Sequence, residues 1–392
     1  MYYPSQPQLP RSSRREFLRT AAVGLTVTAG LGACRSARRR YVVGKPSLTV
    51  EQRLASNFSI SIETRTPVTQ GPTHHRAFPG LTRLKDGTLL VLYREGSDHW
   101  RTDDAVAKVT RSSDDGATWS EPETIHQEEG WGCSSHHGPK QLADGSVMAP
   151  AVAIRHVENG QRGPFEFRVF NLRSHDNGRT WQRKEIGPQP GWVWQNQYGR
   201  IKEIDGMLFQ GGGGAKKGDD FWRTGYFVSH DNGETWPEWR TIATHLQDEN
   251  DLLELADGRL LSMIRSGKEP SSRATYRSYS NDHGKTWSPA EKLDLFGQCP
   301  SLLMLPSGHI LFGYRQVRPT VHVGIGLAVS PDDGQTWREV EPLYVSPTDS
   351  VDCAYPSMIV DGGHHVLAAY YTTFVDGNSH IELARLRVDV GA

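Results

Sequence analysis

The chain has 392 residues, 23% of them charged, and a formal net charge of −1 at pH 7. This balance lacks the basic excess with which proteins bind nucleic acids, so we expect no nucleic-acid partner. The four cysteines are widely spaced and form no CxxC pair, which predicts neither a disulfide framework nor a metal site. The spacing still allows one disulfide bond. We expect no cofactor.

The first forty residues have the features of an export segment. Arg14 and Arg15 lie in the motif SRREFLR, which matches a twin-arginine signal, and the apolar stretch 21–30 is too short to span a bilayer unaided. The next residues, LGAC, resemble a bacterial lipobox in which Cys34 is lipidated. We expect three parts: a signal peptide over 1–33, a lipid-anchored tether over 34–55 and a folded body over 56–392. The protein would then be exported by the twin-arginine route and held in the periplasm or at the cell surface by its lipid.

Strand-like segments separated by tight turns fill the body. Residues 58–66 alternate apolar and polar side chains, as a half-buried strand does, and they precede the first hairpin. Asp-Gly or Ser-Gly turns between apolar segments predict six hairpins, because glycine tolerates positive φ and the residue before it bonds the turn backbone. The turn glycines are Gly87, Gly145, Gly206, Gly258, Gly308 and Gly362. Their spacing of about 50 to 60 residues indicates a repeat array or a propeller.

A second motif, S-x-D-x-G-x-T-W, recurs five times between the hairpins. The copies begin at Ser112, Ser174, Ser229, Ser280 and Ser330. The Asp and Thr can bond the backbone of a tight turn, and the Trp can fill a gap between neighbouring sheets, so we assign these boxes a structural role. Together the two repeats predict an all-β fold: a six-bladed β-propeller whose ring is closed by the N-terminal strand in the last blade. Closure of this kind removes exposed sheet edges.

Five boxes with six blades resemble the sialidase superfamily of β-propellers, and the repeats cover nearly all of the mature chain. The stretch 248–265, DENDLLELADGRLLSMIR, is similar almost residue for residue to the DEN…VELxDGRxxxxxR stretch of bacterial sialidases. In that family the Glu helps to deprotonate a Tyr nucleophile, and the Arg binds the sialic acid carboxylate. The resemblance assigns the base to Glu249 and a carboxylate contact to Arg265. It also assigns the nucleophile to Tyr355, which lies in the last blade after the last box.

The resemblance places the residue that acts as acid and base in the loop before the first box. Asp98 in EGSDHW matches the family's aspartic acid best, and Asp103 and Asp104 are alternatives. A neutral phenol suits an anionic sugar, because it is not repelled as a carboxylate nucleophile would be. A phenol with a pKa of about 10 needs a neighbouring base, which Glu249 can supply, and a desolvated Asp98 could protonate the leaving oxygen. The expected activity is that of an exo-acting retaining glycoside hydrolase, which releases terminal sialic acid or a related acidic sugar from glycans.

The chain departs from the family at two of the three arginines that bind the carboxylate. The family's Y/F-R-I-P motif corresponds to RAFP, in which Arg76 is displaced by one position, and such a shift turns a strand side chain to the other face. The third family arginine aligns near His322. The hairpins offer substitutes, since three arginines each lie seven residues after a turn glycine and so at one edge of the sheets: Arg94, Arg265 and Arg315. We keep Arg76 and these three as candidate substrate ligands.

The same edge gathers further polar side chains, as an acidic-sugar pocket requires. The additional candidates for substrate binding are His136, His137 and Asn250. Two other function classes stay open: a glycosidase or lyase on a different acidic or deoxy sugar, in which one of these histidines serves, and a noncatalytic glycan-binding propeller. The expected partner is a glycan or glycoconjugate, and we expect a monomer that contacts the membrane through its lipid only.

Overall fold

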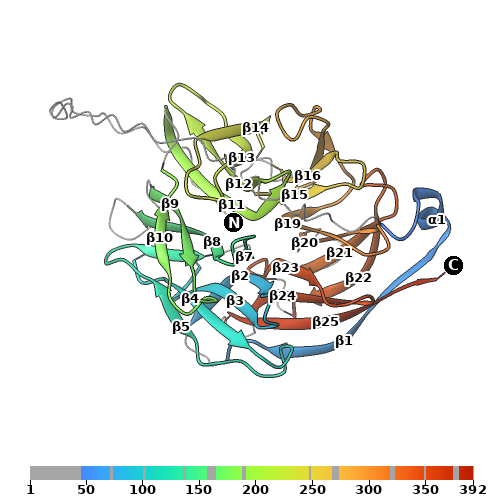
Figure 1. Cartoon of the computed structure of the whole chain (residues 1–392), viewed down its shortest axis with the longest axis horizontal. Helices are drawn as coiled ribbons and strands as arrows, with labels where there is room; N and C mark the ends of the chain where they lie inside the picture. Colours follow the sequence, from blue (N-terminus) through green and yellow to red (C-terminus); the bar gives the residue numbers. More distant parts are fainter. Residues whose placement is uncertain are drawn as a thin grey trace, which may run out of the picture.

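The computed structural model describes most of the expected body as β-structure. The described residues are 46–70, 74–99, 103–135, 138–156, 165–187, 191–246, 249–266, 273–317, 323–347, 350–373 and 379–391. They form 25 strands and one short helix, so the predicted all-β class is confirmed. Figure 1 shows the sheets arranged around a common centre. The chain visits them in turn from its blue N-terminal end to its red C-terminal end. The one helix in these ranges lacks the length and hydrophobicity needed to cross a membrane.

The largest sheet contains eight strands and joins the two ends of the body. Its order is β23-β24-β25-β2-β3-β4-β5, and β1 pairs antiparallel with β25. A single parallel pairing of His75 with Ser379 connects β2 to β25, so the first and last hairpins share one sheet. The bounds are β1 (Asn57–Pro67), β2 (His75–Arg83), β3 (Leu89–Gly96), β4 (Val106–Ser112), β5 (Glu123–His126), β23 (Ala354–Val360), β24 (His365–Thr373) and β25 (Ser379–Gly391). The N-terminal strand therefore lies beside the last hairpin, as its sequence predicts.

Four smaller antiparallel sheets follow the same plan, each with one predicted hairpin next to the centre. The second comprises β6 (Gly132–Ser135), β7 (Lys140–Gln141), β8 (Val147–His156), β9 (Phe165–Ser174) and β10 (Gln182–Glu185). The third comprises β11 (Trp192–Ile204), β12 (Met207–Lys216), β13 (Arg223–Ser229) and β14 (Glu238–Thr244). The fourth comprises β15 (Asn250–Glu254), β16 (Leu260–Arg265), β17 (Thr275–Ser280) and β18 (Glu291–Lys292). The fifth comprises β19 (Gly297–Met304), β20 (Ile310–Gln316), β21 (Gly324–Ser330) and β22 (Arg338–Val345).

Hydrophobic side chains fill the space between neighbouring sheets. The second strand of a hairpin is buried on both faces, and for this reason Leu89–Tyr93 of β3 is an unbroken apolar run, with every residue fully buried. One cluster packs Phe209 of β12 and Tyr226 of β13 against Leu260 of β16 in the next sheet. Such clusters fix the angle between sheets, and so they fix the positions of the strand ends at the centre.

The five S-x-D-x-G-x-T-W boxes are turn staples, as predicted. In the first, Asp114 accepts hydrogen bonds from Ser112 Oγ (2.7 Å), Thr118 N (2.9 Å) and Thr118 Oγ1 (2.6 Å). The same bonds recur in the other four boxes. These donors lower the pKa of the Asp114 carboxyl to about 2. Each box tryptophan packs into a hydrophobic cluster, so the motif helps to hold the sheets together.

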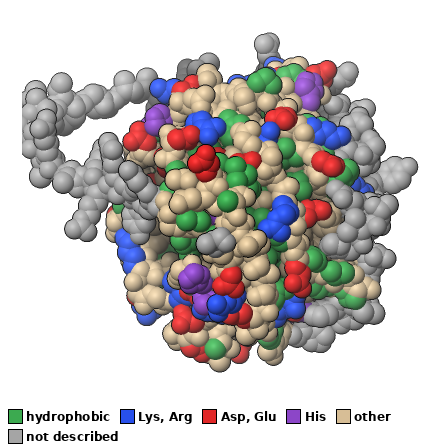
Figure 2. Space-filling model, turned by 90° about the vertical axis from the view of Figure 1, so that its right-hand side faces the viewer, with side chains coloured by type: hydrophobic (Ala, Val, Ile, Leu, Met, Phe, Trp, Pro, Cys, Tyr) green, Lys and Arg blue, Asp and Glu red, His purple; other side chains and the backbone are tan. Residues whose placement is uncertain are grey.

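A short helix, α1 (Val50–Ala55), lies in the segment expected to be a tether. Thr49 caps it, and Gln52 bonds back to the cap, a reciprocal pattern that the sequence T-x-x-Q could have revealed. Arg53 is buried and binds Pro331 O (2.6 Å) and Asp333 (2.6 Å), which ties the segment to the fifth sheet. Figure 2 shows the side of the molecule on the right of Figure 1, where described acidic and basic side chains are interspersed. Cys34 and the expected signal peptide lie outside the described residues.

Candidate active site

Four hairpins carry a β-bulge where their first strand reaches the centre. The register shifts between Ala77 and Gly80, Gln197 and Ile201, Gln298 and Ser301, and Ala354 and Ser357. A bulge re-aims the side chains beside it, and bulges are common next to active sites.

Three of these bulges hold a residue at positive φ directly before a proline. They are Phe78 (φ 59°), Cys299 (φ 54°) and Tyr355 (φ 47°). Bulky residues in this region cost about 1–3 kcal/mol each, and they cluster at functional sites. The strained backbone therefore marks the same strand ends that carry the candidate nucleophile.

Glu249 lies at the centre of a buried set of donors. Its Oε1 accepts from Tyr355 Oη (2.5 Å) and from Arg265 Nη1 (2.5 Å), and its Oε2 accepts from the Cys299 amide (3.0 Å). The candidate base and nucleophile are thus in direct contact, although 106 residues separate them in the chain. Glu249 is 2% exposed and Tyr355 7% exposed, so the contact is largely shielded from water.

The phenol of Tyr355 is a proton donor in this environment. Burial raises its pKa well above 10, the nearby Cys299 and Glu249 add to the rise, and Arg315 and Arg265 oppose it. The protonated phenol can then give its proton to the carboxylate only 2.5 Å away. The arrangement suits a nucleophile that ionises as it attacks.

The arginines found by hairpin register all lie in this region and are buried. Arg265 binds Glu249, as described. Arg315 donates from Nε to Cys353 O (2.7 Å) and from Nη2 to Tyr371 Oη (3.2 Å), and its guanidinium carbon lies 5.2 Å from the centre of the Tyr355 ring. Arg94 donates to the main-chain oxygen of Asp98 (2.9 Å).

A histidine–aspartate–histidine group, which the sequence analysis missed, connects Arg94 to Arg315. Asp352 Oδ2 lies 2.8 Å from His75 Nε2, and its Oδ1 lies 2.7 Å from His99 Nδ1. Tyr371 Oη donates to the same Oδ1 (2.8 Å). Burial opposes ionisation here, but the hydrogen bonds from both histidines hold the pKa of Asp352 far below its usual range.

We call the connected side chains the inner cluster: His75, Arg94, His99, Glu249, Arg265, Arg315, Asp352, Tyr355 and Tyr371. A weak signal for the missed members existed in the sequence. His75 is next to Arg76, His99 is next to Asp98, and Asp352 lies three residues before Tyr355. The missed residues therefore flank the segments that carry the resemblance.

Other candidates have different surroundings. Arg76 binds Glu95 (2.8 Å), because it lies opposite Glu95 in the β2–β3 pairing while the next residue, Ala77, lies opposite Arg94. Arg76 and Arg94 therefore point to opposite faces of the sheet, as the one-residue shift in the sequence predicts. Asn250 donates to Thr224 Oγ1 (2.9 Å) in the third sheet, which gives it a structural contact.

Asp98 is exposed, and so are its rivals Asp103 and Asp104. Asp98 reaches the inner cluster through its main-chain oxygen, which Arg94 binds. Of the remaining candidates, His136 and His137 lie outside the described residues, as does His322.

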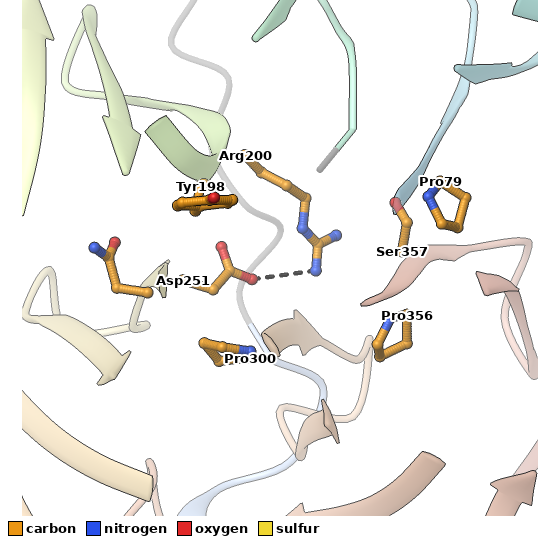
Figure 3. A pocket seen from close by; sticks show the side chains of 9 residues that line it. Pro79, Tyr198, Arg200, Asp251, Pro300, Pro356 and Ser357 are labelled. Carbon is orange, nitrogen blue, oxygen red and sulfur yellow. Dashed lines mark hydrogen bonds and ion pairs between the residues drawn. The ribbon is translucent and has the colours of Figure 1, made fainter. Parts of the chain in front are cut away.

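A small pocket lies among the strand ends that meet near the centre of the molecule (Figure 3). Its lining includes the chain neighbours of the strained residues, Pro79, Pro300 and Pro356. Arg200 extends across it from β11 and binds Asp251 (3.1 Å), as the dashed line in Figure 3 shows. Asp251 also accepts from the Leu302 amide (2.7 Å). Asp251 lies two residues after Glu249 in the chain.

Two groups in the described ranges bring three metal-ligand side chains within 4.8 Å: His75, His99 and Asp352, and His126, Glu128 and Cys133. In the first group, the three side chains already bond one another. In the second, Glu128 binds Arg168 and Arg183, and burial raises the pKa of Cys133 to about 12, which disfavours the thiolate that a metal needs. We interpret both groups as hydrogen-bonded clusters of side chains.

Comparison with known proteins places these features in context. Residues 53–204 and 201–367 match the BNR repeat-like domain family. A sialidase of Paraclostridium sordellii is 27% identical over 234 residues, which cover 52% of this chain and 56% of that protein. A sialidase of Micromonospora viridifaciens is 25% identical over 373 residues, which cover 84% of this chain and 54% of that protein. The chain thus spans little more than half the length of these relatives.

Solved structures show the same architecture at lower identity. A Hadza microbial sialidase superposes with a TM-score of 0.64 at 20% identity, over 79% of this chain and 65% of that one. An α-L-arabinanase of Penicillium chrysogenum, complexed with arabinobiose, gives a TM-score of 0.61 at 14% identity, over 83% and 98%. At such identities the likeness establishes a shared fold alone.

Proposed function

The chain belongs to the BNR repeat-like domain family, and on this premise we propose that it is a glycoside hydrolase of sialidase type. The fold we infer is a six-bladed β-propeller, in which the eight-stranded sheet supplies the first and the last blade. The pairing of β1 with β25 supports this inference, because it completes the last four-stranded unit and links the two ends of the ring.

The reaction we propose uses Tyr355 as the nucleophile and Glu249 as its base. The phenolic oxygen bonds to the anomeric carbon while the bond to the leaving oxygen breaks, and the phenolic proton passes to Glu249. Water then releases the sugar from the tyrosine, and the net stereochemistry is retained. The hydrogen bond of 2.5 Å between these two side chains is the observation that carries the proposal. Arg265 supports it, because it donates to the same carboxylate oxygen and so helps to hold Glu249 against the phenol.

We propose an acidic sugar as the substrate. The inner cluster contains three guanidinium groups, those of Arg94, Arg265 and Arg315, against two carboxylates, those of Glu249 and Asp352. Among the described residues, Arg315 donates from Nε and Nη2, which leaves Nη1 for a substrate. A guanidinium can bind a carboxylate through two parallel bonds, and such charge-assisted bonds are stronger than neutral ones.

A neutral sugar is the second candidate. Arg76, which corresponds to the first family arginine, is engaged by Glu95, and the shared fold also occurs in an arabinanase. Under this alternative the arginines of the inner cluster would bind hydroxyl groups or support the site.

Tyrosine-to-phenylalanine variants test the nucleophile. Tyr355→Phe removes only a hydroxyl, so the fold should survive while turnover of an aryl sialoside falls by at least about 1,000-fold. Tyr370→Phe is a matched control, because Tyr370 is also buried and also donates to a glutamate, Glu382 (2.8 Å), outside the inner cluster. Wild-type kcat in Tyr355→Phe would exclude this tyrosine as the nucleophile.

We further propose that the export motif and Cys34 act as their sequences indicate. The signal over 1–33 would direct export through the twin-arginine route, and lipid on Cys34 would hold the body in the periplasm or at the cell surface. Helix α1 supports a short connection, because it binds residues 46–55 to the fifth sheet through Arg53.

A further inference from the structure

We propose that His99, oriented by Asp352, is the general acid and base of the reaction, in the role that the resemblance assigns to Asp98. This inference rests on the proposed hydrolase with Tyr355 as nucleophile. The resemblance assigns this role to an aspartic acid, and the geometry and charges of the inner cluster support a histidine instead.

The hydrogen bond to Asp352 fixes which nitrogen of His99 can move a proton. The distance of 2.7 Å between Nδ1 and Asp352 Oδ1 places a proton on Nδ1, because a carboxylate only accepts. Nε2 is then the nitrogen that gains and loses a proton. A carboxylate that holds one imidazole nitrogen in this way orients the ring and stabilises its charged form.

The second histidine has the opposite arrangement. His75 Nε2 donates to Asp352 Oδ2 (2.8 Å), and its Nδ1 faces Arg94 Nη1 at 3.5 Å. A guanidinium has no acceptor, so Nδ1 of His75 accepts, and both ring nitrogens of His75 are engaged within the inner cluster. His75 is therefore a positioning residue for Asp352, and proton transfer is left to His99.

The two side chains proposed to act on the sugar contact the same aromatic ring. Phe78 lies 4.8 Å from Tyr355 and 5.4 Å from His99, measured between ring centres, and both contacts are edge-to-face. His99 is partly exposed, whereas Tyr355 is buried. In an exo-acting enzyme the terminal sugar is enclosed and the leaving group points to solvent. His99 therefore lies on the side where the leaving oxygen needs a proton.

Asp98 does not share this environment. It is exposed, and Arg94 binds its main-chain oxygen (2.9 Å). The carboxylate embedded in the inner cluster is Asp352, which holds His99.

The charges around His99 suit a group that is protonated only when substrate is present. Burial lowers its pKa, Asp352 opposes this, and His75 and Arg315 lower it further. Arg94 and the phenol of Tyr371 lie beyond Asp352 on the same network. A bound anionic sugar would raise the pKa of His99 by supplying negative charge. In the first step Nε2–H protonates the leaving oxygen. In the second step Nε2 takes a proton from a water molecule while the water oxygen bonds to the anomeric carbon. The bond from the sugar to Tyr355 breaks, and Tyr355 recovers its proton from Glu249.

The test compares His99→Asn with Asp98→Asn on two sialosides. Asparagine keeps a donor near the position of Nδ1, so the bond to Asp352 and the fold should survive, and thermal unfolding checks this. The nitrophenolate of a nitrophenyl sialoside can leave without being protonated. The alkoxide of an alkyl sialoside is a poorer leaving group, so an acid must protonate its oxygen. General acid catalysis contributes about 100- to 10,000-fold, so His99→Asn should lose that much on the alkyl substrate and under about tenfold on the nitrophenyl one.

The pH profile and a second nucleophile complete the experiment. Activity of the wild type on the alkyl sialoside should fall as pH rises through the pKa of His99, and this limb should vanish in His99→Asn but remain in Asp98→Asn. Azide, which needs no base, should raise turnover of the nitrophenyl substrate in His99→Asn and yield the glycosyl azide.

One result would contradict the His99 assignment alone, and a different result would contradict the proposed function. A loss confined to the alkyl substrate in Asp98→Asn, with equal losses on both substrates in His99→Asn, would return the role to Asp98 and leave the hydrolase proposal intact. Full activity of Tyr355→Phe would overturn the proposed function, and the His99 assignment with it.

Discussion

Replacement of Arg315 by alanine should discriminate against acidic substrates. Arg315 is 8% exposed, its guanidinium carbon lies 5.2 Å from the centre of the Tyr355 ring, and within the described residues its hydrogen bonds come from Nε and Nη2. A substrate carboxylate would make at least one charge-assisted bond with it, and such bonds contribute about 1.5–3 kcal/mol each. With a partly bidentate contact, the loss in kcat/KM on an acidic sugar should be about 2–4 kcal/mol, which corresponds to about 30- to 1,000-fold.

The neutral analogue of the same sugar isolates the carboxylate contact. Arg315→Ala also removes the bonds to Cys353 O and Tyr371, which affects both substrates equally. On a methyl ester the loss should therefore stay under about tenfold. Arg315→Lys should recover little activity on the acid, because an ammonium group cannot reproduce the planar fork.

Arg277→Ala is the control for a general loss of stability. Arg277 has the same exposed fraction of 8%, but it binds Glu291 (2.9 Å) away from the inner cluster. It should lower the melting temperature and leave the ratio of acid to ester turnover unchanged. Equal losses on acid and ester in Arg315→Ala would refute the carboxylate assignment and favour a neutral sugar.

Three further predictions concern the base, the boxes and the anchor. Glu249→Gln should lower kcat by about 100- to 10,000-fold, because the phenol loses its base. It should also lower the melting temperature, because the buried Arg265 loses its counter-charge. Steady-state kinetics and calorimetry check this, and unchanged kcat would exclude Glu249 as the base. The pKa of Asp114 is depressed from 3.8 to about 2, so its contribution to stability is present above pH 3.8 and is lost as pH falls through about 2; unfolding of wild type and Asp114→Asn should converge in acid, and parallel curves would contradict this. Cys34→Ala should abolish labelling by a radioactive fatty acid, and equal labelling of both proteins would refute lipidation.

The parts of the fold that repeat were predictable from the sequence. Hairpin turns such as that at Gly258 and boxes such as that at Ser112 bond locally, so the residues that form them lie close together in the chain. The hairpin offset also placed Arg265 and Arg315 at one edge, because antiparallel pairing conserves register between neighbouring strands. The single inter-sheet pairing of His75 with Ser379 has no local signal, and it merges the expected first and last blades into one sheet.

The missed part of the site depends on contacts between distant segments. Asp352 meets His75 and His99 across more than 250 residues. The positive φ of Phe78 and Tyr355 turns these rings toward each other, and strand periodicity alone does not reveal such a bulge. The contact of Glu249 with Tyr355 was expected only because the resemblance supplied both roles.

Trapping of the glycosyl-enzyme tests the central claim most directly. A sialyl fluoride with a second fluorine beside the anomeric carbon should react with the wild type and then hydrolyse slowly. Mass spectrometry of the digested protein should find one sugar on the peptide that contains Tyr355, and none in Tyr355→Phe. A sugar attached to Glu249 or to another residue, or turnover of the reagent without any adduct, would contradict a tyrosine nucleophile.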